Sequence, residues 1–296
     1  MNSFRHEFRA LLRGLAFLSP WLVGFLAFTL VPVALSLYYS FTDYTLLQPP
    51  LYTGLDNYRT LGGDPVFWKV LRNTAVYALM ALPLGMLGAL GVAMLLNNKV
   101  RGVTIYRTIV FLPSLVPAVA SAMLWLWLFN TKLGLINTAL RGLGFDNPPG
   151  WLTDADWALS ALVLMSLWGI GNTVVIYLAG LQDVPRELYE AADIDGASAG
   201  RKVWHVTLPY VSPVIFFNLV MGLIGSLQVF AAPLIMTQGG PARATYFYTM
   251  YLYDNAFRFL NMGYASAMAW VQLLLVLALT ALAFWSGKRW VHYQGR

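Results

Sequence analysis

The chain has 296 residues, of which 58% are hydrophobic and 11% charged, with a net charge of +6. Soluble globular proteins carry about 25% charged residues, so this composition excludes a soluble enzyme, a disordered chain and a fibrous repeat, and it indicates a polytopic membrane protein. The chain has no cysteine, which excludes disulfides, thiolate metal sites and cysteine nucleophiles.

Six long windows contain no Asp, Glu, Lys, Arg or His. About 20 apolar residues are needed to cross roughly 30 Å of hydrocarbon, and each window is long enough. The sequence therefore predicts an all-α polytopic membrane protein, with residues 1–296 forming a single transmembrane domain. The six transmembrane helices are expected at about 15–41, 73–97, 107–130, 157–181, 208–233 and 260–286.

The first window follows three arginines and could be mistaken for a signal peptide. Its apolar run is much longer than the roughly 7–15 residues of a signal-peptide core. We therefore expect an uncleaved first span.

Basic residues gather in the connections that lie on one side of the membrane if both termini are cytoplasmic. These connections hold 12 of the 19 Lys and Arg residues, and the short second loop alone contains Lys99, Arg101 and Arg107. Because cationic short loops stay in the cytoplasm, an N-in, C-in orientation is favoured. The same bias explains the positive net charge better than nucleic-acid binding does.

None of the six windows holds an ionisable side chain. Carriers coupled to protons or sodium usually keep a charged group within the membrane, so such coupling is disfavoured. The chain also lacks a GxxxxGK[ST] phosphate-binding loop, and its three histidines, His6, His205 and His292, show no metal-ligand spacing. We expect a non-catalytic protein with no metal site, whose energy source lies on another chain.

Neutral polar and aromatic residues are concentrated in the fourth and fifth spans. Examples are Trp168, Asn172, Ser226 and Gln228. Amide and hydroxyl groups can bind the hydroxyls of a sugar, and an aromatic face can cover its C–H groups. The same residues could instead join helices to one another, and residue chemistry alone leaves both interpretations open.

The fourth loop, residues 183–206, is predicted to form a helical hairpin on the cytoplasmic side. Pro185 suits a first helical position, and Gly196 suits a helix stop. A second short helix is expected from Ser198. Small residues on a short exposed helix suit docking into another protein, while a solvated hairpin is the plainer alternative.

The same loop carries a long gapped motif, Glu190-Ala191-Ala192, then Gly196, Val206 and Leu208-Pro209. It resembles the EAA motif of binding-protein-dependent ABC importer permeases, with Val206 where Ile is usual. Further segments resemble the sugar-permease branch related to the maltose permease subunits, although Gln238 stands where many relatives have glycine. These segments are 40–44, 54–58, 111–113, 228–230, 239–241 and 263–267.

The resemblance implies a type I ABC importer permease in the cytoplasmic (inner) membrane of a bacterium or archaeon. It implies four kinds of partner: a second, different permease subunit, two ABC ATPase subunits that hold ATP and Mg, an extracytoplasmic solute-binding protein and the lipid bilayer. The 183–206 loop would be the coupling loop that contacts an ATPase. Its implied contact residues are Glu187, Tyr189, Glu190, Ala191, Ala192, Asp195, Gly196 and Ala197.

Local similarity to maltose-type permeases also implies a set of solute-binding residues. They are Trp168, Gly169, Asn172, Gly222, Gly225, Ser226, Gln228 and Val229. Spans without charge favour a neutral sugar, such as a disaccharide or oligosaccharide. Glycerol 3-phosphate or a polyol is the alternative, because relatives of this kind carry it, and a facilitator without a motor is a more remote one.

Overall fold

The computed structural model describes residues 2–98 and 101–292, with side chains from residue 12 onward. Lys99 and Arg296, which were counted above among the predicted cytoplasmic cations, lie outside these residues. The chain divides into two compact units, one of residues 1–64 and 252–273 and the other of residues 65–251 and 274–296.

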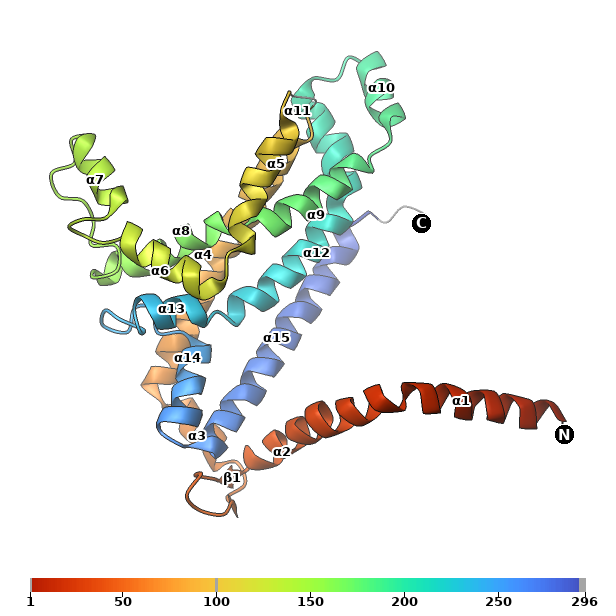
Figure 1. The fold of residues 1–296 in the computed structure, drawn as a ribbon, viewed down its shortest axis with the longest axis vertical. Helices are drawn as coiled ribbons and strands as arrows, with labels where there is room; N and C mark the ends of the chain where they lie inside the picture. Colours follow the sequence, from red (N-terminus) through yellow and green to blue (C-terminus); the bar gives the residue numbers. More distant parts are fainter. Residues whose placement is uncertain (1, 99–100, 293–296) are drawn as a thin grey trace. The chain divides into compact units, whose positions relative to one another are not determined.

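The first unit combines the start of the chain with a segment that is distant in sequence (Figure 1). Its elements are α1 (Asn2–Phe25), a π-helical turn (Leu26–Leu30), α2 (Val31–Tyr39), the antiparallel pair β1 (Thr42–Asp43) and β2 (Leu51–Tyr52), α3 (Asp56–Gly63), a second π-helical turn (Asp254–Arg258) and the start of α15 (Met262–Trp290).

Three motif segments of the sequence meet in this unit. The Asn57 side chain donates to the carbonyls of Ser40 at 3.0 Å and Thr42 at 2.8 Å. The backbone N–H of Gly263 donates to the Tyr44 carbonyl at 3.0 Å. Segments 40–44, 54–58 and 263–267 therefore form one hydrogen-bonded junction, so three separate sequence motifs build one local structure.

Gly263 at this junction leaves no room for a side chain. A Cβ there would lie 2.1 Å from the carbonyl oxygen of Thr42, a backbone atom. We expect Gly263→Ala to lower the stability of the assembled protein by about 3 kcal/mol, because the backbone must shift. Thermal unfolding of the purified complex would measure this, with Gly62→Ala, which has open space around its Cβ, as the control. Equal melting temperatures for the two variants would contradict the prediction.

The second unit is a helical bundle (Figure 1). Its helices are α4 (Pro65–Leu96), α5 (Val103–Phe111), a 3₁₀ turn (Leu112–Leu115), α6 (Ala118–Leu128), α7 (Leu135–Gly142), α8 (Ala155–Trp168), α9 (Gly171–Gln182), α10 (Arg186–Ile194), α11 (Ala199–Lys202), a π-helical turn (Val203–Thr207), α12 (Leu208–Leu227), α13 (Ala231–Met236), α14 (Tyr248–Tyr253, which continues into the first unit) and the end of α15.

Helix α4 is the centre of this bundle and packs against α8, α9 and α12. Small side chains allow the close approach: Ala89 and Ala93 are fully buried against Val174 and Tyr177 of α9. A second core holds Tyr77, Trp125 and Phe247. These two cores fix the helices that surround the candidate site.

Within the part of the chain that the structure describes, four helices are long and apolar enough to cross a membrane: 12–39, 65–96, 199–236 and 262–290. Two helix pairs raise the number to six if each is one span: Val103–Leu115 with Ala118–Leu128, bent by 99°, and Ala155–Trp168 with Gly171–Gln182, bent by 48°. The prediction of an all-α fold with several membrane spans is confirmed. The first bend follows from Pro113 and Pro117, since proline removes a helix hydrogen bond.

Candidate functional site

Two cavities of the second unit adjoin each other, and the larger of this pair lies between α4, the α8–α9 break and α12. Its volume is about 630 Å³. Such a volume falls within the roughly 300–1,000 Å³ typical of small-molecule sites. Residues from the three elements line it, namely Tyr77, Ala81, Leu82, Gly85, Met86, Ser166, Gly169, Ile170, Thr173, Ile176, Phe217, Asn218, Met221, Gly222, Gly225, Ser226 and Val229.

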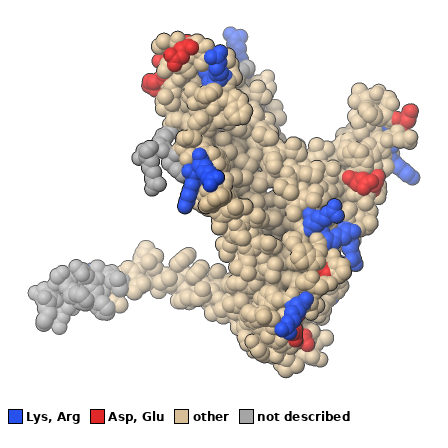
Figure 2. Space-filling view, turned by 180° about the vertical axis from the view of Figure 1, so that it is seen from behind, with Lys and Arg blue, Asp and Glu red and all other residues tan. Residues whose placement is uncertain are grey.

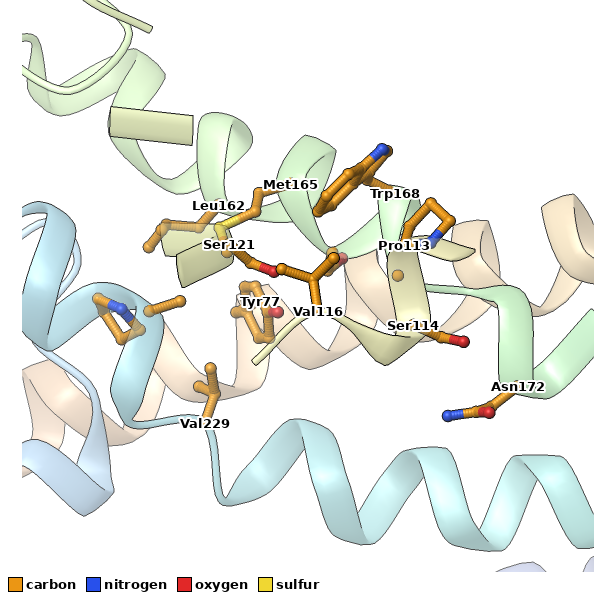
Figure 3. A pocket seen from close by; sticks show the side chains of 14 residues that line it. Tyr77, Pro113, Ser114, Val116, Ser121, Leu162, Met165, Trp168, Asn172 and Val229 are labelled. Atoms are coloured by element: carbon orange, nitrogen blue, oxygen red, sulfur yellow. The ribbon is translucent and has the colours of Figure 1, made fainter. Parts of the chain in front are cut away.

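The smaller cavity, of about 230 Å³, is bounded by the bent segment around Pro113, by α6, α8 and α13 (Figure 3). Its lining residues are Tyr77, Pro113, Ser114, Val116, Ser121, Leu162, Met165, Ser166, Trp168, Gly169, Asn172, Val229, Ala232 and Pro233. Neither lining set, among the residues that the structure describes, contains Asp, Glu, Lys, Arg or His. The two cavities can therefore offer hydroxyl, amide and aromatic contacts but no fixed charge.

Four residues line both cavities: Tyr77, Ser166, Gly169 and Val229. They come from α4, from the end of α8 and from the turn after α12. Helix α8 breaks at Gly169 and α12 ends before Gln228. At each break the backbone leaves the helix and can line a cavity. The two cavities thus adjoin at these four residues.

The structure brings seven of the eight predicted solute-binding residues to these cavities. Trp168 and Asn172 line the smaller one, Gly222, Gly225 and Ser226 the larger one, and Gly169 and Val229 both. Gln228 is exposed and lines neither cavity. Their role in binding solute stays a prediction.

Sequence reasoning did not single out Tyr77, Ser114, Ser121 or Ser166 as candidate site residues. Their spans are predominantly apolar, and single hydroxyls there are usually bonded to the helix backbone; Ser166, for example, donates to the Val163 carbonyl at 2.6 Å. Only the tertiary arrangement shows that they share a cavity with Trp168. Asn218 and Thr173, two further polar residues of the fifth and fourth spans, also line the larger cavity.

Two glycines of α12 face the larger cavity in different ways. A Cβ at Gly222 would lie 2.4 Å from the Leu82 side chain, while a Cβ at Gly225 would meet nothing within 4 Å. Gly222 therefore allows α12 to approach α4. Gly225 leaves space that a solute can occupy.

The segment after α13 is held firmly on α4. The Lys69 side chain donates to the Ala242 carbonyl at 2.7 Å, and Asn73 donates to the carbonyls of Arg243 at 2.8 Å and Tyr246 at 3.0 Å. Burial also raises the pKa of the Tyr248 hydroxyl above its ordinary value, so this group stays neutral. The loop 237–247 is thus an ordered structure built on one helix.

The predicted coupling loop forms a helical hairpin that projects beyond α9 and α12 (Figure 1). Helix α10 starts at Arg186 and α11 at Ala199, each one residue later than predicted. Of the eight predicted contact residues, five are exposed and three half-buried. The exposed residues are Glu187, Glu190, Ala191, Asp195 and Gly196, and the half-buried ones are Tyr189, Ala192 and Ala197.

Hydrogen bonds fix the shape of this hairpin. Gly196 ends α10 with a φ of +68°, and the N–H groups of Ala197 and Gly196 donate to the carbonyls of Ala192 and Asp193 at 2.9 and 3.0 Å. This pair of bonds is a Schellman motif, which favours glycine. The Tyr189 and Thr207 hydroxyls also share a hydrogen bond of 2.9 Å. The hairpin therefore presents a preformed exposed helix.

Charge is sparse elsewhere on the surface (Figure 2). Most of the visible surface is uncharged, and acidic and basic side chains occur together over the α10 end and over the α7 end. An ion pair between Lys202 and Asp193 lies within this hairpin. Within residues 12–98 and 101–292, no group of three or more His, Asp or Glu could hold a metal ion.

Comparison with known proteins gives a consistent result. Residues 81–292 match the family model described as "Binding-protein-dependent transport system inner membrane component". The probable ABC transporter permease protein YesP of Bacillus subtilis is 41% identical over 96% of this chain and 93% of its own length. The lactose transport system permease protein LacF of Rhizobium radiobacter is 34% identical, over 93% of this chain and 94% of its own.

A solved structure shares the fold. It is the crystal structure of a bacterial ABC transporter involved in the import of the acidic polysaccharide alginate. The TM-score is 0.85, with 24% identity, and the match covers 98% of this chain and 99% of the other. The predicted type I importer permease fold is thereby confirmed.

Proposed function

The chain belongs to the family of binding-protein-dependent transport system inner membrane components, the permeases of ABC importers. From that membership we propose that it is the translocation subunit for a neutral sugar, moved from a binding protein into the cytoplasm. One observation carries the choice of solute: Trp168, Asn172 and Ser226 meet around two adjoining cavities whose linings hold no charged side chain.

The chemistry of these cavities suits a disaccharide or short oligosaccharide. A Trp168 ring can cover the C–H face of a sugar ring, and the amides of Asn172 and Asn218 with the Ser226 hydroxyl can bind its hydroxyl groups. A charged solute would find no counter-charge there and would lose its hydration. A neutral solute is therefore favoured.

Glycerol 3-phosphate is the second candidate, favoured by cations outside the cavities. Lys69, Arg72 and Arg243 are exposed on α4 and loop 237–247, and none forms an ion pair with a residue of the described segments. They could attract an anion to this face. The solute would still have to pass cavities without charge.

The partners follow from the proposal. The chain would pair with a different permease subunit, with two ATPase subunits holding ATP and Mg, and with an extracytoplasmic binding protein. The first span supports such an assembly. In the most apolar 18-residue window of helix 12–39, no residue is buried against the rest of this chain. Catalysis would then reside on the ATPases, and both termini would be cytoplasmic.

Trp168 offers a direct test of the solute assignment. We expect Trp168→Ala to raise the KM for sugar uptake about tenfold, the effect of losing one aromatic contact. The matched control is Trp127→Ala, since Trp127 is exposed on α6 and lines neither cavity. Equal KM values for both variants would contradict a role for Trp168 in solute binding.

The function itself is tested with the complete complex in proteoliposomes. Radiolabelled lactose, other neutral oligosaccharides and glycerol 3-phosphate would be supplied with the binding protein outside and ATP inside. We expect uptake of a neutral sugar only with ATP. Uptake without ATP would indicate a motor-free facilitator, and uptake of glycerol 3-phosphate alone would favour the second candidate.

A further inference from the structure

Tyr77 occupies a special place among the residues that line the two cavities. It is the only α4 residue, among those described, that lines the smaller cavity, whereas the larger cavity also touches Ala81, Leu82, Gly85 and Met86 further along α4. In Figure 3 its ring lies between the Val116 segment and Val229. Along α4, the smaller cavity therefore ends, and the larger one begins, at Tyr77.

Two contacts hold the Tyr77 side chain in this position. Its hydroxyl lies beside the Ser166 hydroxyl of α8. Its ring packs edge-on against Phe247, with ring centroids 5.3 Å apart. Both rings are buried, Tyr77 at 7% exposure and Phe247 at 0%. The ring therefore bridges α4, α8 and the end of loop 237–247.

The residues that bind loop 237–247 lie on the same face of α4. Lys69, Asn73 and Tyr77 are spaced four residues apart, so they are aligned along the helix. Lys69 and Asn73 bind loop carbonyls, and the backbone N–H of Tyr248 donates to the Thr74 hydroxyl at 2.9 Å. The anchoring of the loop thus continues without a gap to the Tyr77 ring.

We propose that Tyr77, positioned by Ser166 and Phe247, is the barrier residue between the two cavities, and that solute enters the larger cavity only when this ring moves. The proposal rests on the proposed function, since it concerns the same route. Loop 237–247 lies on the predicted extracytoplasmic face, and its anchors on α4 connect that face to the Tyr77 ring. A displacement of loop 237–247 would move Phe247 and release one side of the Tyr77 ring.

The absence of native cysteine in the chain makes the barrier measurable. Ser226→Cys places a thiol in the larger cavity and Ser121→Cys places one in the smaller cavity. Each variant is assembled into the complete complex in ATP-depleted spheroplasts. A membrane-impermeant methanethiosulfonate is added outside, and modification of this chain is followed by mass.

We expect Ser121→Cys to react in every background and Ser226→Cys to be protected while Tyr77 is present. Adding Tyr77→Phe removes the hydroxyl that lies beside Ser166 and should raise the Ser226→Cys rate about fivefold, and Tyr77→Ala should raise it further. The matched control is Tyr177→Phe. Tyr177 is fully buried, lines neither cavity, and its hydroxyl has no hydrogen-bond partner among the described residues.

Three results would overturn the proposal: an unchanged Ser226→Cys rate in both Tyr77 variants, an equal increase in Tyr177→Phe, or an unreactive Ser121→Cys. If Tyr77→Ala does not assemble, Tyr77→Phe still decides. Failure of the proposed orientation is recognised separately. Exposed Asp146→Cys should react from outside and exposed Ser198→Cys should not. The reverse would contradict the proposed function. The comparison of Tyr77 variants would then report on access from the opposite side of the membrane.

Discussion

Glu190→Lys combined with Gly196→Asp is expected to reduce ATP-driven uptake to background while the protein still inserts and assembles. Glu190 is exposed on α10, so its replacement reverses a surface charge without disturbing a core. Gly196 has a φ of +68° at the end of α10, a conformation that costs other residues about 1 kcal/mol or more. Together the changes alter the charge and the exit of the helix that we expect to meet the ATPase.

The measurement is sugar uptake together with ATPase activity in the reconstituted complex. A charge reversal on an exposed loop far from α10, Asp146→Lys, serves as the control for the change in net charge. We expect this control to transport normally. Normal uptake in the Glu190→Lys, Gly196→Asp variant would refute the coupling role of the hairpin.

Gly225→Trp is expected to block transport with little effect on folding. The position lines the larger cavity, and a Cβ there meets no atom within 4 Å, so a side chain can start from this position without a backbone clash. The indole would occupy the space that we assign to the solute. Uptake should fall to background, while expression and assembly with the partner subunits remain near normal.

The matched control is Gly91→Trp on α4. Gly91 also has open space around its Cβ, is exposed, and lines neither cavity. We expect it to transport normally, because its indole would face away from the solute route. If both variants transport equally well, the larger cavity is not part of that route.

The helices and the coupling hairpin could be predicted from the sequence because their signals are local. Apolar windows indicate spans, and Gly196 after an apolar stripe indicates a helix end, which the structure places at Ile194, with Asp195 as the C-cap. Pro113 and Pro117 interrupt the third predicted span, but the 99° bend there depends on packing that the sequence does not express.

The cavity lining was only partly predictable. Polar residues near Trp168 and Ser226 stood out against apolar spans, and most of them line a cavity. Tyr77 did not stand out, because an aromatic residue in a span is common and its contact with Phe247 joins residues 170 positions apart. Gln228 lies outside both linings because α12 ends at Leu227, so its side chain no longer follows the helix face.

The short strands β1 and β2 were also not predicted. Each has two residues, which is too short for an alternating pattern to be visible. They help to place segment 40–44, whose partners Asn57 and Gly263 were known only as parts of separate motifs. Junctions of this kind require the tertiary structure.

Photocrosslinking at Leu188 in the complete complex tests the central claim most directly. Leu188 is 43% exposed on α10, and a benzoylphenylalanine there should capture the nucleotide-binding subunit, with a yield that changes when ATP is bound. The same group at exposed Leu143, after α7, should not capture it. A hairpin that crosslinks to no ATPase in a complex shown to transport would contradict the account.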